Sequence, residues 1–160
     1  MNAWSRLNLA LAVVAAVLLT ALLMPEEDAD NDRLLDIKRD TITSLRVERS
    51  ERLALSFERD DRGWRLLHPE VAPAELQRVE QLIAVTRAAV LQRFAVPDDL
   101  QPYGLNAPAA VMQVNQQRLL FGDRDPSQRH RYVLVGDQLC VIDDVYFNLL
   151  KLPATHFLQQ

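Results

Sequence analysis

Few residues of this chain have the types and spacing that catalysis requires. A nucleophilic enzyme needs a serine or cysteine within hydrogen-bond reach of a base, and a third group that orients the base. The single cysteine, Cys140, lies in the apolar segment QLCVID, which favours a small buried side chain, and Ser56 falls in an expected strand where it would point to water. The histidines lie at a strand end, near a turn and near the C-terminus, at His68, His130 and His156. We therefore predict no catalytic residue and no enzyme activity.

The segment DRDPS is the candidate for a metal loop. Asp123, Asp125 and Ser127 have the spacing that opens a calcium-binding loop, but such a loop also needs glycine at its sixth position and glutamate at its twelfth. Those positions hold Gln128 and Leu134. The segment therefore indicates a β-hairpin turn, and we predict no metal site. The four glycines leave little room for a phosphate-binding loop, so no cofactor is predicted.

Charge argues against a nucleic-acid partner. After Met24 the chain has 17 basic and 22 acidic residues, a net charge of −5, whereas nucleic acids are bound with clustered positive charge.

Arginine is nevertheless unusually frequent, with 16 arginines and two lysines among the 18 basic residues. Several fall in expected strands, at Arg46, Arg49, Arg52, Arg59, Arg62 and Arg65. Cross-strand ion pairs with Glu48, Glu51 and Glu58, of about 0.2–1 kcal/mol each, are one interpretation, and a GC-rich genome would raise arginine content by itself. The alternative is a surface that binds carboxylates or phosphates through bidentate guanidinium contacts.

The segment Leu7 to Met24 is almost entirely apolar and carries no charge. A helix of that length spans about 27 Å, close to the hydrocarbon thickness of a bilayer. A cleaved signal peptide is the alternative, but its apolar region is usually about 7–15 residues and small residues follow it. Bulky residues precede Pro25 instead. We predict that residues 1–24 form an uncleaved transmembrane anchor that contacts the lipid bilayer.

The flanking charges predict the orientation of this anchor. Arg6 precedes it, and five acidic residues between Glu26 and Asp32 follow it before any basic residue. By the positive-inside rule, the N-terminus is cytoplasmic and the rest lies in the periplasm of a bacterium, anchored to the inner membrane. Residues 25–41 are either an extended acidic juxtamembrane linker or simply a soluble surface.

Alternating apolar residues from Ser44 onward predict strands at 44–50, 52–60 and 63–69, with a turn at Gly63. A helix is expected to begin at Pro73, with an apolar stripe of Leu76, Val79, Leu82, Ile83 and Val90, and an extended segment follows at 91–96. Four further short strands are expected in AAVMQVNQ, RLLFGD, RHRYVLVGD and QLCVID. Strand runs followed by helices predict an α+β fold with mostly antiparallel β-sheet lobes.

A last helix is expected after Asp143, which would cap it, with Val145, Leu149 and Leu152 facing inward and Pro153 ending it. An exposed tail with Phe157 and Leu158 would follow. The two halves of the expected periplasmic domain, 42–160, share a strand, charged turn and aromatic-led strand, which indicates a degenerate β-meander-plus-helix repeat at 42–96 and 104–160.

The segments SLRVER, GWRLLHP, AELQRVEQLIAV, YGLNAP, LLFGD and YVLVGDQ together resemble a bacterial family known as domain of unknown function 4340. The resemblance runs from about Ile42 to Leu158. Its most telling residues are those of turns and core aromatics, Gly63-Trp64, Tyr103-Gly104-Leu105 with Pro108, and Tyr132-Val133. It implies membrane-tethered extracytoplasmic proteins, some encoded beside ABC-type transporter components related to gliding-motility export.

Three functions are compatible with these patterns. The first is a non-catalytic accessory subunit that presents a periplasmic domain to an integral-membrane protein partner, such as an ABC-type transport system. The second is a binding module or enzyme for an anionic cell-envelope ligand, and the third is a divisome or secretion scaffold. The expected partner contacts are Arg46, Arg49, Arg52, Phe157 and Leu158.

Overall fold

A computed structural model describes residues 33–159 of the chain. The anchor predicted at residues 1–24, and most of the linker predicted at 25–41, lie outside these residues. No helix within 33–159 is long and apolar enough to cross a membrane.

The described residues form a nine-stranded sheet with the order β4-β3-β2-β1-β6-β7-β8-β9-β5, in which every neighbouring pair is antiparallel. The strands are β1 (Ser44–Arg49), β2 (Arg52–Asp60), β3 (Gly63–His68), β4 (Ala72–Pro73), β5 (Val90–Ala95), β6 (Ala110–Val114), β7 (Gln117–Arg124), β8 (His130–Val135) and β9 (Gln138–Asp143). The α-helices are α2 (Leu76–Ile83) and α3 (Phe147–Leu150). The short 3₁₀-helices are η1 (Arg39–Thr41), η2 (Ala84–Arg87), η3 (Gln101–Tyr103), η4 (Asp144–Tyr146) and η5 (Ala154–Phe157). The α+β class with a mostly antiparallel sheet is confirmed.

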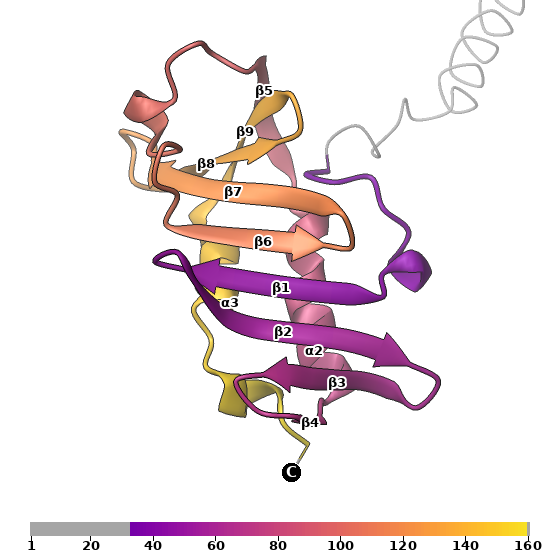
Figure 1. The fold of residues 1–160 in the computed structure, drawn as a ribbon. Coiled ribbons are helices and arrows are strands. Elements are labelled where there is room, and N and C mark those ends of the chain that lie inside the picture. Colours follow the sequence, from indigo (N-terminus) through magenta and orange to yellow (C-terminus); the bar gives the residue numbers. More distant parts are fainter. Residues whose placement is uncertain (1–32, 160) are drawn as a thin grey trace, which may run out of the picture. The chain divides into compact units, whose positions relative to one another are not determined.

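The two halves of the domain share this one sheet and do not form separate lobes. The first meander, β1-β2-β3, extends from the centre toward one edge, and the second, β6-β7-β8-β9, extends toward the other (Figure 1). They meet where β1 pairs with β6, with Val47 opposite Met112. The internal repeat stays a prediction, although the strand and hairpin order is the same in both halves.

One face of the sheet is covered by α2, which lies behind the strands in Figure 1. Leu45 and Val47 point to this covered face and are fully buried, while the intervening Arg46 points to the opposite side and is exposed. Successive side chains of β1 therefore point to opposite faces of the sheet, as the sequence predicts. We call the side opposite α2 the open face.

The expected helix stripes are only partly correct. Val79, Leu82 and Ile83 of α2 are buried, but Leu76 is 53% exposed, and Val90 belongs to β5 because the helix tightens into η2 and ends before it. Asp143 caps η4 as predicted, accepting a hydrogen bond from the Val145 backbone N–H. Val145 itself is 58% exposed, so its predicted inward orientation is wrong.

The prediction of an exposed C-terminal tail is also wrong. Phe157 is completely buried, and its ring packs edge-on against Phe57 at a centroid distance of 5.1 Å. Leu158 is half-buried and bridges to Ala74, and the Gln159 N–H donates to the Pro73 carbonyl. The C-terminal residues therefore lie beside β4 and cover that edge of the sheet.

Candidate functional site

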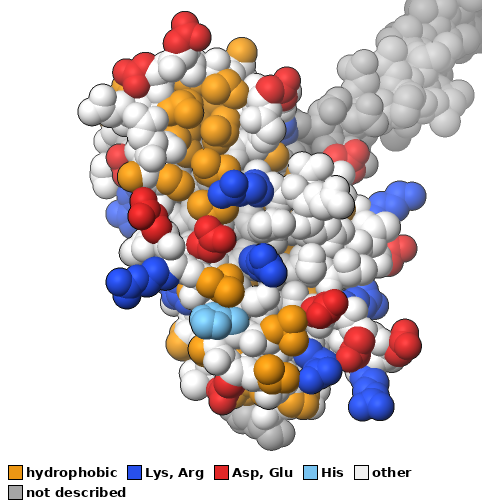
Figure 2. Space-filling view, viewed as in Figure 1, with side chains coloured by type: hydrophobic (Ala, Val, Ile, Leu, Met, Phe, Trp, Pro, Cys, Tyr) orange, Lys and Arg blue, Asp and Glu red, His pale blue; other side chains and the backbone are white. Residues whose placement is uncertain are grey.

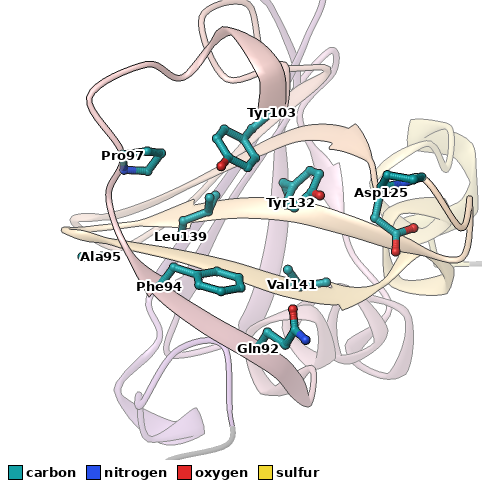
Figure 3. A pocket seen from close by; sticks show the side chains of 10 residues that line it. Gln92, Phe94, Ala95, Pro97, Tyr103, Asp125, Tyr132, Leu139 and Val141 are labelled. Carbon is teal, nitrogen blue, oxygen red and sulfur yellow. The ribbon is translucent and has the colours of Figure 1, made fainter.

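The candidate site is a cavity of about 280 Å³ on the open face, at the β5 end of the sheet. Strand β5 contributes Gln92 and Phe94, β9 contributes Leu139 and Val141, and β8 contributes Tyr132 (Figure 3). The register explains this gathering, because Phe94 lies opposite Leu139 and Tyr132 lies opposite Val141. The remaining lining residues come from two loops and from the end of β5, and are Ala95, Pro97, Tyr103, Asp125 and Pro126.

Two glycines, Gly104 and Gly122, allow the loop that carries Tyr103 to lie close to strand β7. Gly104 ends η3 in the left-handed conformation with φ of 66°, and a Cβ there would lie 2.4 Å from the Asp123 carboxyl carbon. A Cβ on Gly122 would lie 2.1 Å from the Tyr103 carbonyl oxygen. Only glycine permits such an approach of loop to strand. The Tyr103 ring consequently meets the Tyr132 ring edge-on, with centroids 4.9 Å apart.

The polar edge of the cavity is formed by Asp125 in the turn between β7 and β8. Its carboxylate accepts hydrogen bonds from the Ser127 hydroxyl at 2.8 Å and from the His130 backbone N–H at 3.2 Å, and lies 3.1 Å from the His130 ring nitrogen Nδ1. Burial by itself would raise the pKa of Asp125, but the hydrogen bonds from Ser127 and His130 outweigh it and lower the pKa to about 2.

This Asp-Ser-His group is organised to hold the turn and not to activate the serine. The Ser127 hydroxyl donates to the Asp125 carboxylate, whereas an activated nucleophile would donate to the imidazole, which is 3.5 Å away. All three residues lie within one six-residue turn, which confirms the hairpin turn predicted for this segment. Within residues 33–159 no group of His, Cys, Asp and Glu has the arrangement of a metal site.

Apolar surface continues outward from the cavity. Phe94 and Val96 are 47% and 37% exposed. Figure 2 shows apolar side chains gathered on the upper part of the open face, with acidic side chains above and beside them and a basic side chain below. Asp98, Asp99 and Asp137 are exposed in the loop after Pro97 and in the turn before Leu139.

The arginines singled out in the sequence do not come together at this site. Arg46 is exposed on the open face and lines a separate depression of about 340 Å³. Arg49 donates to the carbonyls of Lys151 and Leu152 at the end of α3, and Arg52 is exposed at the β1–β2 hairpin. Ser56, expected to face water, is 7% exposed and lines the same depression as Arg46.

Ion pairs among the described residues use other partners than the expected Glu48, Glu51 and Glu58. They join Arg39 to Glu80, Arg65 to Asp60, Arg78 to Glu75, and Arg124 and Arg131 to Asp144. The pair of Arg131 and Asp144 is buried, with the two residues 6% and 8% exposed. The arginine content is thus partly explained by structural pairing, which weakens the interpretation of a convergent anion site.

Sequence reasoning missed the cavity, although β9 carried a signal for it. The run Leu139 to Ile142 is apolar without alternation, a pattern typical of a strand that is buried on both faces. Cys140 and Ile142 belong to the core beneath the covered face, whereas Leu139 and Val141 line the cavity. The buried Cys140 confirms the expectation of a small apolar side chain, and burial raises the pKa of its thiol, an effect that Arg93 partly offsets.

Comparison with known proteins identifies the family. Residues 10–108 match the family described as "Domain of unknown function (DUF4340)", over more than half of the 160-residue chain, so the chain belongs to this family. The match confirms the resemblance found in the sequence, but it starts earlier and ends earlier than expected. No curated protein and no solved structure matches the chain.

Proposed function

We propose that this member of the DUF4340 family is a non-catalytic, single-pass inner-membrane protein whose periplasmic domain is an accessory subunit of a membrane complex, with an ABC-type transport assembly as the first candidate. The observation that carries the proposal is the cavity on the open face, which mixes apolar and polar lining residues, with Phe94 and Val96 exposed beside it. Exposed apolar surface around a cavity is typical of a surface that binds another protein or a ligand.

The size and lining of the cavity favour a protein partner over a small substrate. At about 280 Å³ it lies just below the range of roughly 300–1,000 Å³ that is common for small-molecule sites. Its walls are aromatic rings, aliphatic chains and the Gln92 amide, and its carboxylate, Asp125, already accepts hydrogen bonds within its own turn. A cavity of this kind fits one or two large side chains of a partner.

The position of the cavity relative to the start of the domain favours an integral-membrane partner. Arg33, the first described residue, bridges to Ala89 immediately before β5. Eight residues separate Arg33 from Met24, where the predicted anchor ends. The family match begins at residue 10, inside the apolar run Leu7 to Met24, which supports counting this run as part of the region that the family shares.

The test is site-specific photo-crosslinking of the full chain in native membranes, with the crosslinker replacing Phe94. Leu76 is the matched control, because it is an apolar residue of similar exposure, 53% against 47%, on the helix behind the sheet. We expect a defined integral-membrane protein to be captured from position 94 and not from position 76. Identical capture from both positions, or repeated recovery of the chain alone, would refute the proposal.

The identity of the captured protein separates the accessory role from a divisome or secretion scaffold, which would use the same surface. A reporter fused after Gln160 tests the topology independently. Activity of a periplasm-specific reporter is expected, and activity of a cytoplasm-specific one contradicts the placement.

A further inference from the structure

The two edge strands of the sheet, β4 and β5, differ in what lies beside them. At the β4 edge, Leu158 bridges to Ala74 and Gln159 hydrogen-bonds to Pro73. At the opposite edge, β5 pairs with β9 along one side, and among residues 33–159 no strand lies along its other side. The bridge from Arg33 ends at Ala89, so this edge begins at Val90. Leu91 to Ala95 are all exposed. Within the part of the chain that the structure describes, the outer side of β5 has no neighbouring strand, and a sheet edge of this kind is a template for an added strand.

The edge of β5 and the cavity belong to one surface. Gln92 and Phe94 line the cavity, and they point to the open face together with Val141 and Leu139 of the neighbouring strand (Figure 3). A strand added outside β5 would lie about 4.8 Å away and would place every second side chain on that same face, beside Phe94. One such side chain can therefore enter the cavity while the backbone continues the sheet.

The charges around the cavity indicate the partner's composition. Four aspartates, Asp98, Asp99, Asp125 and Asp137, lie in the segments that border it, against two arginines, Arg93 and Arg129, and none of the lining residues is basic. The nearby Arg93 guanidinium donates to the Gln138 side chain at 2.6 Å and to the Arg33 carbonyl at 2.8 Å, so it is engaged within the domain. An acidic border of this kind is complementary to basic residues and repels anionic lipid headgroups.

We propose that β5 is a strand-addition site for an extended segment of a partner protein that carries one large apolar side chain flanked by lysine or arginine. The backbone of the segment hydrogen-bonds to β5, its apolar side chain fills the cavity, and its basic residues face the four aspartates. This mode supplies affinity through the main chain and specificity through alternate side chains. The inference rests on the proposed function, because it names the surface and the kind of segment by which the partner is held.

The experiment measures binding of labelled peptides to the full chain in nanodiscs. The probe is a short peptide with a central phenylalanine and a lysine two positions to either side, separated by threonines. Three matched peptides change one property each, namely phenylalanine to alanine, both lysines to glutamate, and methylation of the backbone nitrogens on one edge. We expect each of the first two changes to weaken binding by roughly tenfold or more, because each removes a contact worth about 1.5 kcal/mol or more. Backbone methylation should abolish binding, since it removes donors without altering the side chains.

Variants of the chain provide the second arm. Asp98→Asn with Asp99→Asn should weaken binding of the lysine peptide and make it less sensitive to salt, whereas Asp61→Asn, an exposed carboxylate in the β2–β3 turn, should leave it unchanged. Phe94→Ala should weaken all peptides that carry phenylalanine. Hydrogen exchange at the β5 amides should slow when peptide is bound.

The result that overturns the inference is equal binding of the methylated and unmethylated peptides, or equal binding of the lysine and glutamate peptides. Absence of peptide binding together with concentration-dependent dimerisation would assign the edge to a second copy and also overturn it. These outcomes are separable from the proposed function. Crosslinking from Phe94 to a membrane protein can succeed while the peptide series fails, and the peptides can bind when no membrane partner is captured.

Discussion

Replacing Asp144 by asparagine tests how the second half of the domain is held together. The Asp144 carboxylate accepts a hydrogen bond from the Arg131 Nε at 2.6 Å and forms an ion pair with the Arg124 Nε at 2.7 Å. Arg131 is 6% exposed, and its guanidinium also donates to the Gly122 carbonyl and lies 3.7 Å from the centre of the Phe147 ring. This one ion pair therefore connects β7, β8, η4 and α3.

The magnitude follows from burial. Asp144→Asn leaves the Arg131 charge buried without a counter-charge, which costs about 3–5 kcal/mol of unfolding free energy. Arg124 is 42% exposed, so Arg124→Ala removes a largely solvated pair and costs about 1 kcal/mol or less. Adding Arg131→Met to Asp144→Asn removes the uncompensated charge and should recover part of the lost stability.

Urea unfolding of the full chain in mild detergent, followed by circular dichroism, measures these differences. With a slope of about 2 kcal/mol per M, Asp144→Asn lowers the midpoint by roughly 1.5–2.5 M and Arg124→Ala by about 0.5 M or less. The reasoning is refuted if the two single variants have equal midpoints, or if the double variant is less stable than Asp144→Asn.

Three further predictions concern a hairpin, a carboxylate and the thiol. Glu51 occupies the β1–β2 turn with φ of 60°, a conformation that costs a non-glycine residue about 1–2 kcal/mol, so Glu51→Gly should raise the urea midpoint while Glu58→Gly within β2 lowers it. The pKa of Asp125 is lowered to about 2 from 3.8, so the folded state binds fewer protons than the unfolded state between these values. Its contribution to stability is complete above about pH 5 and is lost as the pH falls toward 2. Asp125→Asn should flatten the fall in urea midpoint over this range, and a curve unchanged from wild type would contradict the assignment. The Cys140 thiol is buried with a raised pKa, so a thiol reagent at pH 8 should label it far more slowly in the native chain than in urea, and equal rates would show that the strand opens readily.

The strands could be predicted because apolar alternation and burial coincide in this sheet. Leu45 and Val47 are buried on either side of the exposed Arg46, as the period of two requires. The turn at Gly63 was also predictable, since its φ of 121° is one that other residues avoid. Both features depend on neighbours in sequence and need no knowledge of long-range pairing.

The wrong prediction for Val145 has a geometric cause. A 3₁₀-helix has three residues per turn, so its inward positions recur every third residue and not at the spacing of an α-helix. Through η4 and α3 the most buried residues are Asp144, Phe147 and Leu150, each three apart. Of the residues in the predicted α-helical stripe, Leu149 and Leu152 pack partly buried against the core, and Val145 is exposed. A charged residue at the first of the three buried positions concealed the pattern, because its burial depends on Arg131 from another strand.

The cavity could not be predicted, because its walls come from segments far apart in the chain and are brought together by strand order. In the sheet order β5 follows β9, so residues near 92–97 meet residues near 139–141 across a connection that passes through all of β6, β7 and β8. Sequence patterns describe which face of a strand is buried, but not which strand becomes its neighbour. The apolar run of β9 indicates that its side chains are buried on both sides of the sheet. Only the fold shows which residues lie over Leu139 and Val141 on the side opposite α2.

The family match divides the cavity in two, and this limits what membership alone can explain. Gln92, Phe94 and Tyr103 fall within residues 10–108, whereas Tyr132 and Leu139 lie beyond them. The matched half contributes the edge strand and the loop with Tyr103, and the unmatched half contributes the floor of the cavity. A bound segment that pairs only with the β5 backbone would contact the matched part of the chain. A segment that also inserts a side chain into the cavity would contact the strands after residue 108 as well. The methylated and phenylalanine-free peptides separate these two contributions in this chain.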